Sequence, residues 1–381
     1  MLRSTPSAQC AWLGAAVAAG ALATTAAAGP PACRPPEETR SPFGTSASSG
    51  DGGGAAAGEG GRAEGAGGRA EGAGGAGGKG GAGGTGGHGA GGSDGGAGPV
   101  DPPPDAAPLS IVTWNTKDFF NDKDDTAGDA EIVLSPAEYR EKREAIAAVL
   151  AELDPDVAVL QEVEHLGVLE DLNRIELGGA YPHAALVEAY DPRGIDVGAL
   201  SKIPFDRVVS HRDDRFTLRG TSGPVYTFTR DCIELHLSRG GRKVILLGVH
   251  FKAKAAPDDP DRRLAEAQRA RAIADALAAE HPTAAIAVLG DFNDVPGSPP
   301  VEAVAGAGPG AFEDAAAAAP PADQWTYDFR GQLELIDHQL VNPLLRRMLD
   351  PRSIRIPHGP SIEGASDHAP IFSGYRITPP T

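Results

Sequence analysis

Short apolar runs recur along the chain from residue 109 onward, and most of them end at a polar residue or a glycine. Apolar or alternating runs of roughly four to eight residues predict strands, whereas apolar positions three and four apart predict helices. Helices are therefore expected at 165–177, at 262–280 and in a segment that begins at Pro136. Strands are expected at 109–114, 157–160, 195–200, 206–210, 226–237, 243–249, 285–289, 335–341 and 369–373.

Local signals support some of these elements and indicate the fold class. Ser135 and Glu138 form a capping box around Pro136, and the glycines 240–241 predict a hairpin turn. In the helix at 262–280, Arg262 and Glu266 stand four residues apart and are expected to pair on the surface. Strands outnumber helices, and hairpins mix with strand–helix units. The pattern predicts a mixed α/β domain with a largely antiparallel core, not a doubly wound parallel sheet.

Several of the predicted strands end in an acid, an amide or an imidazole. The residues at these ends are Asn115 after LSIVTW, Glu162 after VAVLQ and His250 after VILLGV. The run AIAVLGDFN, 285–293, adds Asp291 and Asn293, which share one face if the chain stays extended there. A further polar cluster, SDH, occupies 366–368. The pattern indicates one site at the rim of a β core.

Composition divides the chain into three parts. Residues 1–28 have one early charge, Arg3, and an Ala-rich run, which is the pattern of a signal peptide and is too poor in large apolar residues for a membrane span. Gly fills 28 of the 55 positions 44–98. Without large apolar side chains to bury, such a segment cannot compensate for the conformational entropy that it would lose on folding. Residues 29–104 are therefore expected to be a disordered Gly/Ala/Pro-rich tether. Residues 105–378 are expected to form one domain.

Charge and cysteine content limit the choice of partner and compartment. The formal net charge is −18, which argues against tight non-specific binding of nucleic acid, although a bound divalent cation can supply local positive charge for a phosphate. Cys10, Cys33 and Cys232 offer no disulfide framework despite the expected export. Lipid attachment at Cys33 is a less favoured alternative, because Pro30 and Pro31 fit a bacterial lipobox poorly.

The side chains at the strand ends are mostly oxygen donors, with two imidazoles and no cysteine cluster. Hard oxygen ligands suit Mg²⁺, Mn²⁺ or Ca²⁺ better than a zinc site. A metal that neutralises phosphoryl oxygens, together with an acid–base system, is what phosphate-ester hydrolysis requires. Taken singly, such residues are more often turn residues, helix caps or structural histidines. His338 and His358 are interpreted as structural histidines. Their joint occurrence favours catalysis.

Seven segments, in order, resemble the endonuclease/exonuclease/phosphatase superfamily, which includes DNase I and abasic-site endonucleases. The segments are TWN (113–115), LQEVE (160–164), GALSK (198–202), GVHFKAK (248–254), GDFND (290–294), LIDHQLV (335–341) and SDHAP (366–370). The likeness covers 109–374, nearly the whole predicted domain. It implies a four-layer αββα sandwich of two packed, mixed, largely antiparallel sheets with the site at one sheet edge.

The resemblance also implies a role for each matching polar residue around the metal and the attacking water. Glu162 resembles the principal metal carboxylate, and Asn115 is similar to the amide that helps to hold the same ion. Asp367 resembles an acid near the metal. Asp291 matches the acid that orients or deprotonates the water, and Asn293 the amide that steadies the phosphoryl oxygens.

The remaining matches concern the phosphate and the proton transfers. His250 resembles the first family histidine, which contacts the scissile phosphate or acts as an acid. His368 matches the second histidine, and Asp337 the acid that orients it. Arg230 stands where relatives place a basic side chain that faces the phosphate. The resemblance leaves open whether Asp291 or His368 is the general base.

These features predict an exported, metal-dependent phosphodiesterase, a nuclease that cuts DNA or RNA by in-line attack of water. The expected cofactor is Mg²⁺, with Mn²⁺ or Ca²⁺ as alternatives. A monomer is expected, with nucleic acid as substrate, no stable protein partner and no transmembrane segment after signal removal. One alternative is a phosphatase or phospholipase acting on inositol phosphates or sphingomyelin-type lipids, although only Trp325 suggests an exposed aromatic loop. The other is a non-catalytic surface-display domain.

Overall fold

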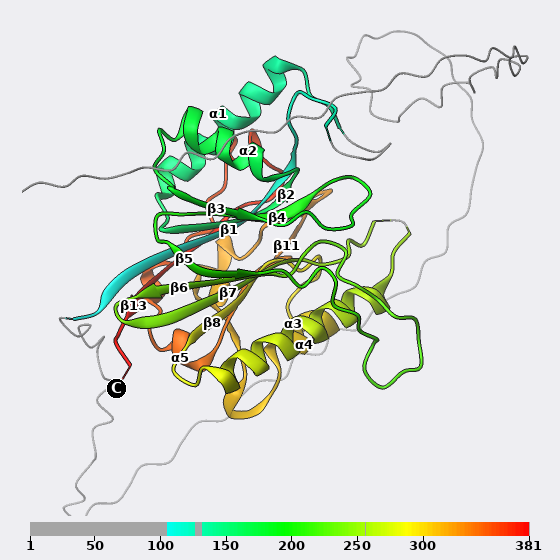
Figure 1. The fold of residues 1–381 in the computed structure, drawn as a ribbon, viewed down its shortest axis with the longest axis vertical. Coiled ribbons are helices and arrows are strands. Elements are labelled where there is room, and N and C mark those ends of the chain that lie inside the picture. The colour runs from blue at the N-terminus through cyan, green and yellow to red at the C-terminus, as the bar shows by residue number, and fades with distance from the viewer. Residues whose placement is uncertain (1–104, 126–131, 256, 381) are drawn as a thin grey trace, which may run out of the picture. The chain divides into compact units, whose positions relative to one another are not determined.

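The computed structural model describes residues 105–125, 132–255 and 257–380, and these form two facing β-sheets with helices on their outer faces (Figure 1). The predicted four-layer α/β sandwich is confirmed. The first sheet has the order β13 (Ile371–Ile377), β1 (Ala107–Phe119), β2 (Val157–Val163), β4 (Asp196–Ser201) and β3 (His183–Leu186). The second has the order β5 (Phe205–Val209), β6 (Ile233–Arg239), β7 (Arg242–His250), β8 (Ala285–Asp291), β12 (Asp337–Val341) and β9 (Glu313–Asp314).

The helices are divided between the two outer faces (Figure 1). The first sheet carries α1 (Pro136–Leu153) and α2 (Leu166–Asp171), which continues as a π-helical turn over Leu172–Glu176. The second sheet carries α3 (Pro260–Glu280) and α4 (Pro299–Ala305). The shorter elements are α5 (Pro343–Arg346), α6 (Pro360–Glu363) and a separate hairpin of β10 (Tyr327–Phe329) and β11 (Gln332–Glu334).

Two apolar clusters hold these layers together. The larger fills the space between the sheets and beneath α1, and the smaller lies between the second sheet and α3. At Gly248 the sheets approach so closely that a Cβ atom would lie 2.8 Å from Val159 Cγ1 and 3.0 Å from Ile233 Cγ2. A larger residue there would push the sheets apart, and the strand ends that follow Gly248 would move with them.

The two local signals in the sequence are confirmed. Glu138 N donates to Ser135 Oγ at 3.3 Å, and Ser135 N donates to the Glu138 carboxylate at 2.8 Å, which is the reciprocal pair of a capping box. β6 and β7 form an antiparallel hairpin in which Gly240 and Gly241 both have positive φ, 55° and 73°. Only such a turn matches the right-handed twist of the two strands, and glycine adopts it without a steric penalty.

Two sequence predictions are wrong in detail. The strand expected at 226–237 begins only at Ile233, because the polar residues before it make tertiary contacts: Thr229 donates to Glu266, and Arg230 pairs with Asp191. The expected surface pair of Arg262 with Glu266 does not form, since Glu266 is fully buried and accepts from the backbone N–H groups of Thr229 and Lys252. Both errors concern polar side chains whose partners lie far away in the sequence.

The predicted signal peptide, the tether, Cys10 and Cys33 lie outside the described residues. Cys232 is buried immediately before β6 and carries a free thiol. Within the described part of the chain, no helix combines the length and the apolar character that a bilayer crossing requires.

Candidate active site

Strand topology places the predicted site residues at one edge of the sandwich. β1 and β2 are parallel, as are β7 and β8, so within each pair the carboxyl ends of both strands point the same way. β12 runs antiparallel to β8, and its first residue, Asp337, lies directly opposite Asp291. The two sheets face each other, so the strand ends from both of them meet above the core. The residues delivered to this edge are Asn115, Glu162, His250, Asp291 and Asp337.

Asn115 joins two carboxylates at the centre of the site. Its Nδ2 donates to Glu162 Oε1 at 3.2 Å and to Asp291 Oδ2 at 3.0 Å. The two carboxylates come from different sheets, so this amide bridges the layers of the sandwich. Asn115 and Asp291 are almost completely buried, and burial strengthens the electrostatic interactions between these groups.

An irregularity in β2 aims Glu162 out of the sheet. The register of β2 against β4 shifts between Gln161 and Val163, and Glu162 adopts a left-handed backbone with φ of 60°. A β-bulge of this kind redirects a side chain, and left-handed non-glycine residues concentrate at functional sites. The Glu162 Oε2 atom accepts the backbone N–H of Asp118 at 2.9 Å, which fixes the carboxylate.

The GDFND loop positions Asp291 and Asn293 differently from the expected extended strand. Asn293 has φ of 54°, and its backbone N–H donates to Asp291 Oδ1 at 2.7 Å. Asn293 Nδ2 donates to the Phe251 carbonyl at 3.1 Å. Before this turn, Gly290 has φ of 143°, and a Cβ atom there would lie 1.9 Å from the Val249 carbonyl oxygen. The two residues enter one site through a tight turn that Asp291 itself closes.

His338 supports the end of the same loop. Its buried ring lies 2.6 Å from Asp314 Oδ2 through Nδ1 and 2.9 Å from the Asp294 carbonyl through Nε2. Burial disfavours its charged form, but the carboxylate of Asp314 outweighs this effect and raises the pKa of His338. The contacts are those of a structural histidine that anchors the loop.

Asp337 and His368 form a buried pair. His368 Nδ1 lies 2.8 Å from Asp337 Oδ2, and the backbone carbonyl of His368 accepts the indole N–H of Trp114 at 2.8 Å. Burial by itself would lower the pKa of His368, but the charge and hydrogen bond of Asp337, with the charge of Asp291, raise it to about 10. The adjacent Asp337 carboxylate therefore favours the charged form of His368.

The pKa values of Asp291 and His250 are displaced in opposite directions, upward for Asp291 and downward for His250. Burial and the adjacent charge of Asp337 raise the pKa of Asp291 to about 7, against the lowering by His368. Burial, together with the charge of Arg230, holds the pKa of His250 well below its usual range. His250 Nε2 lies 3.4 Å from Asp291 Oδ2, and its buried Nδ1 has no hydrogen bond to any described residue. Perturbed groups that converge in this way are typical of catalytic sites.

Asp367 is placed less centrally than the resemblance implies. Its side chain is 39% exposed and forms an ion pair with Lys117 at 2.9 Å. Ser366, its neighbour, donates its hydroxyl to the Asn115 carbonyl at 2.7 Å, which keeps the SDH segment close to β1. The described contacts of Asp367 are with Lys117, and its predicted role near the metal stays a prediction.

Arg230 is buried at the flank of the site beside His250. Its Nη1 donates to the Phe251 carbonyl at 3.3 Å, the same oxygen that Asn293 contacts. Its Nε lies 2.7 Å from Asp191 Oδ2 as an ion pair, although the angle is too poor for a hydrogen bond. Arg230 and Asn293, two of the three side chains predicted to contact the phosphate, are therefore tied to one carbonyl.

Two side chains at the site were not identified from the sequence, Arg193 and Asp118. Arg193 Nη2 lies 3.9 Å from Glu162 Oε1, and its Nη1 lies 3.7 Å from Asp118 Oδ1. Burial, together with the charge of Glu162, raises the pKa of Asp118. Neither residue ends a recognisable strand pattern. Asp118 opens an acidic segment, 118–129, whose described beginning borders the site.

The donor set fits a hard divalent cation. Glu162 Oε1 has nitrogen atoms of Asn115, Arg193 and His250 at 3.2, 3.9 and 4.0 Å, so positive and hydrogen-bonding groups already gather at this oxygen. Asp291, Asp337 and His368 also bring their ligand atoms close enough together to hold an ion. Carboxylate and amide oxygens without thiolates suit Mg²⁺, Mn²⁺ or Ca²⁺.

The family model described as Endonuclease/Exonuclease/phosphatase family matches residues 112–368. The chain belongs to this family. The match begins within β1 and ends at His368, so it encloses every residue assigned to the site above. Membership makes the protein a phosphoric ester hydrolase, and enzymes of this family typically depend on a divalent metal.

Solved structures of the same fold are distant in sequence. The human Nocturnin catalytic domain with bound sulfate is similar over 71% of this chain and 94% of that chain, with 16% identity and a TM-score of 0.51. TDP2 from Caenorhabditis elegans is similar over 71% of this chain and 74% of that chain, with 18% identity and a TM-score of 0.48. An endonuclease/exonuclease/phosphatase from Bacteroides vulgatus is similar over 71% of this chain and 99% of that chain, with 16% identity and a TM-score of 0.47. No curated protein matches the sequence.

Proposed function

We propose that this protein is an exported, Mg²⁺-dependent phosphodiesterase, and specifically a nuclease that hydrolyses DNA or RNA. The observation that supports the proposal most strongly is the convergence of six polar side chains, from both sheets and the SDH segment, at one edge of the sandwich. They are Asn115, Glu162, His250, Asp291, Asp337 and His368. Export is inferred from residues 1–28 alone.

The proposed mechanism assigns the negative charges and the proton transfers to named groups. A divalent ion held by Glu162 and Asn115 would neutralise charge on the phosphoryl oxygens. Asn293 and His250 border the same space and would contact those oxygens. The attacking water would pass its proton to the cluster of Asp291, Asp337 and His368, in which all three ligand atoms lie within 4.8 Å of one another.

Arg230 and Arg193 supply positive charge beside His250 and Glu162. Arg230 is almost completely buried, whereas the Arg193 side chain is 41% exposed and lies above Glu162. A guanidinium presents paired N–H donors that match a phosphate, so both are suited to bind the substrate backbone. This local positive charge supports a phosphate substrate despite the acidic chain as a whole.

One observation favours a lipid-directed phosphodiesterase as the second candidate. The β10–β11 hairpin exposes Phe329 at 47% and Leu333 at 55%, an apolar tip that the sequence did not predict. The same hairpin reaches the site, because the Tyr327 ring lies 4.9 Å from the ring of His368. A non-catalytic display domain is disfavoured, since a decayed enzyme would be expected to have lost some of these contacts.

The proposal is tested by incubating the full chain with plasmid DNA, with RNA and with phospholipid vesicles, each with and without Mg²⁺. We expect hydrolysis of nucleic acid only with the metal, and its loss in Asp291→Ala. Hydrolysis of the vesicles alone would instead support the lipid candidate. Fractionation of expressing cells tests export: retention of the intact chain in the cytoplasm would contradict it.

A further inference from the structure

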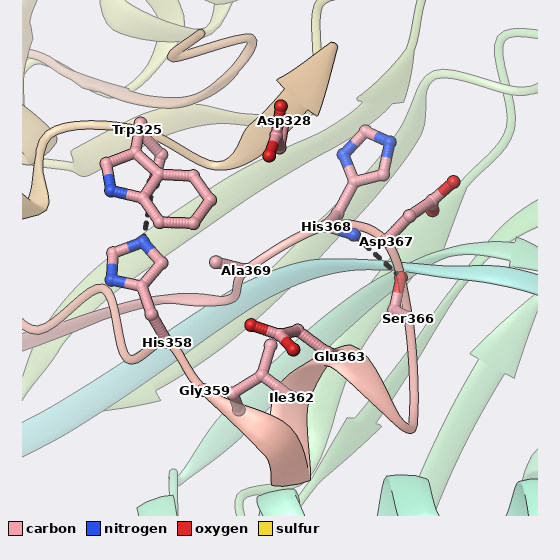
Figure 2. A pocket seen from close by; sticks show the side chains of 10 residues that line it. All are labelled: Trp325, Asp328, His358, Gly359, Ile362, Glu363, Ser366, Asp367, His368 and Ala369. Carbon is pink, nitrogen blue, oxygen red and sulfur yellow. Dashed lines mark hydrogen bonds between the residues drawn. The ribbon is translucent and has the colours of Figure 1, made fainter. Parts of the chain in front are cut away.

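A cavity of about 250 Å³ lies next to His368 (Figure 2). It is bounded by the β10 hairpin, by α6 and by the SDH segment, and its walls include Trp325, Asp328, His358, Glu363 and His368. The volume is below the range of typical drug-sized pockets, so the cavity suits one ring system or a small head group. Because His368 lines it, a group bound there would lie beside the candidate catalytic residues.

One wall of the cavity is a preformed aromatic stack. The rings of Trp325 and His358 lie 3.8 Å apart with an interplanar angle of 14°. His358 Nε2 lies 3.0 Å from the Trp325 carbonyl, which holds the imidazole in place. A rigid flat surface of this kind loses little side-chain entropy when another planar ring binds beside it. The wall therefore favours an aromatic ligand over a flexible aliphatic one.

Two carboxylates face the same space. Asp328 and Glu363 both line the cavity (Figure 2). Asp328 Oδ1 accepts the Gly331 N–H, which fixes its position at the hairpin turn. Carboxylates accept hydrogen bonds and repel phosphates, so a second phosphate group is disfavoured here. The cavity instead favours a ring that carries N–H donors.

We propose that this cavity is a nucleobase subsite that selects guanine. The inference rests on the proposed nuclease activity and specifies its substrate. Guanine presents a ring N–H and an exocyclic amino group side by side, and one carboxylate can accept both in a bidentate pair. Adenine and cytosine offer only an amino group at that edge, and thymine or uracil only a ring N–H. The enzyme therefore cleaves preferentially beside guanosine.

The test uses single-stranded thymidine 20-mers that carry one guanine, adenine or cytosine at the centre, with sequencing of the product ends. The wild-type protein is expected to cleave next to guanine about tenfold faster than next to the other bases, the scale of one stacked and paired base. Asp328→Asn combined with Glu363→Gln should reduce this ratio to about twofold or less. Glu334→Gln, on the same hairpin but outside the cavity, is the matched control and should keep the wild-type ratio.

The inference is overturned if wild-type cleavage shows no base preference, if another base is preferred, or if the double variant keeps the guanine preference. A second set of substrates distinguishes failure of this inference from failure of the nuclease proposal. If the 20-mers are not cut, the 3′- and 5′-p-nitrophenyl esters of guanosine and adenosine monophosphate report the base preference directly. Faster turnover of p-nitrophenyl phosphorylcholine than of the guanosine esters would contradict the guanine assignment, because the cavity would then select a cationic head group.

Discussion

Asp337 lies directly opposite Asp291 in the antiparallel pair of β12 and β8, and it holds His368 Nδ1 at 2.8 Å. Strand register alone therefore brings two carboxylates together, and they raise the pKa of the neighbouring His368. Asp337→Asn should lower the pKa of His368 from about 10 toward its ordinary value near 6.5. NMR titration of the His368 ring in metal-free protein measures this shift, and an unchanged pKa would show that Asp337 does not set it.

The same pair predicts how stability depends on pH. The folded-state pKa of His368 is above its unfolded value, so the stabilisation is fully present below pH 6.5 and is lost as pH rises toward 10. Asp337→Asn should therefore cost on the order of 3 kcal/mol at pH 6 and progressively less toward pH 10. Urea unfolding of metal-free wild type and variant across this range provides the comparison, and a difference that grows with pH would contradict the assignment.

Glu162 and Asp367 should differ in their effect on metal binding. Glu162 stands at the centre of the donor cluster, whereas Asp367 forms a partly exposed ion pair with Lys117. Glu162→Gln should weaken Mg²⁺ or Mn²⁺ binding by at least about tenfold. Asp367→Asn should change the metal affinity by less than about threefold, since Asp367 pairs with Lys117 and exposed ion pairs contribute little free energy. Isothermal titration of both variants decides the point, and an equal loss would restore Asp367 as a ligand.

Asp191 should act as a positioning residue for the two arginines. Its carboxylate lies 2.7 Å from Arg230 Nε and 3.7 Å from Arg193 Nε, and it accepts the Arg193 backbone N–H at 2.8 Å. Asp191→Asn should raise KM for a phosphodiester by about tenfold with a smaller change in kcat, because substrate contacts are displaced while the reacting groups remain. The exposed pair of Asp213 with Arg212 supplies the control, Asp213→Asn, for which no change in KM is expected.

Gly290 should be sensitive to the smallest substitution. A Cβ atom would lie 1.9 Å from the Val249 carbonyl, so Gly290→Ala must displace β8 from β7 and move Asp291 with it. We expect a loss of about 2 kcal/mol or more in unfolding free energy together with reduced kcat. Gly297→Ala is the control, since Gly297 also has positive φ, 80°, but no atom within 4 Å of its added Cβ. Equal costs at both positions would show that the close approach is unimportant.

The strands, the cap of α1, the β6–β7 turn and most of the site could be predicted, because each leaves a local mark in the sequence. Asn115, Glu162, His250 and Asp291 follow apolar strands, and strands that end at a common edge bring such residues together. Their mutual placement came from the family resemblance, since no periodicity specifies which strands are neighbours.

The parts that could not be predicted depend on hydrogen bonds and ion pairs of polar side chains, most of them between distant segments. Arg193 lies on a turn with no apolar pattern, and its position near Glu162 depends on the contact of Asp191 with Arg230. Asn293 was expected in an extended chain, yet its backbone N–H donates to the Asp291 carboxylate and closes a left-handed turn. Glu266 was expected at the surface, but two backbone N–H groups compensate for its burial. Side chains that accept backbone N–H groups compete with the regular pattern that local propensity predicts.

The central claim is that polar groups from both sheets act together on a phosphodiester with a divalent ion. The most direct test is turnover of bis-p-nitrophenyl phosphate by the full chain, with Mg²⁺ and with excess EDTA, in wild type and Asp291→Asn. We expect turnover with Mg²⁺ that falls at least about a thousandfold with EDTA and in the variant. Undiminished turnover in EDTA, or a variant as active as wild type, would contradict the account.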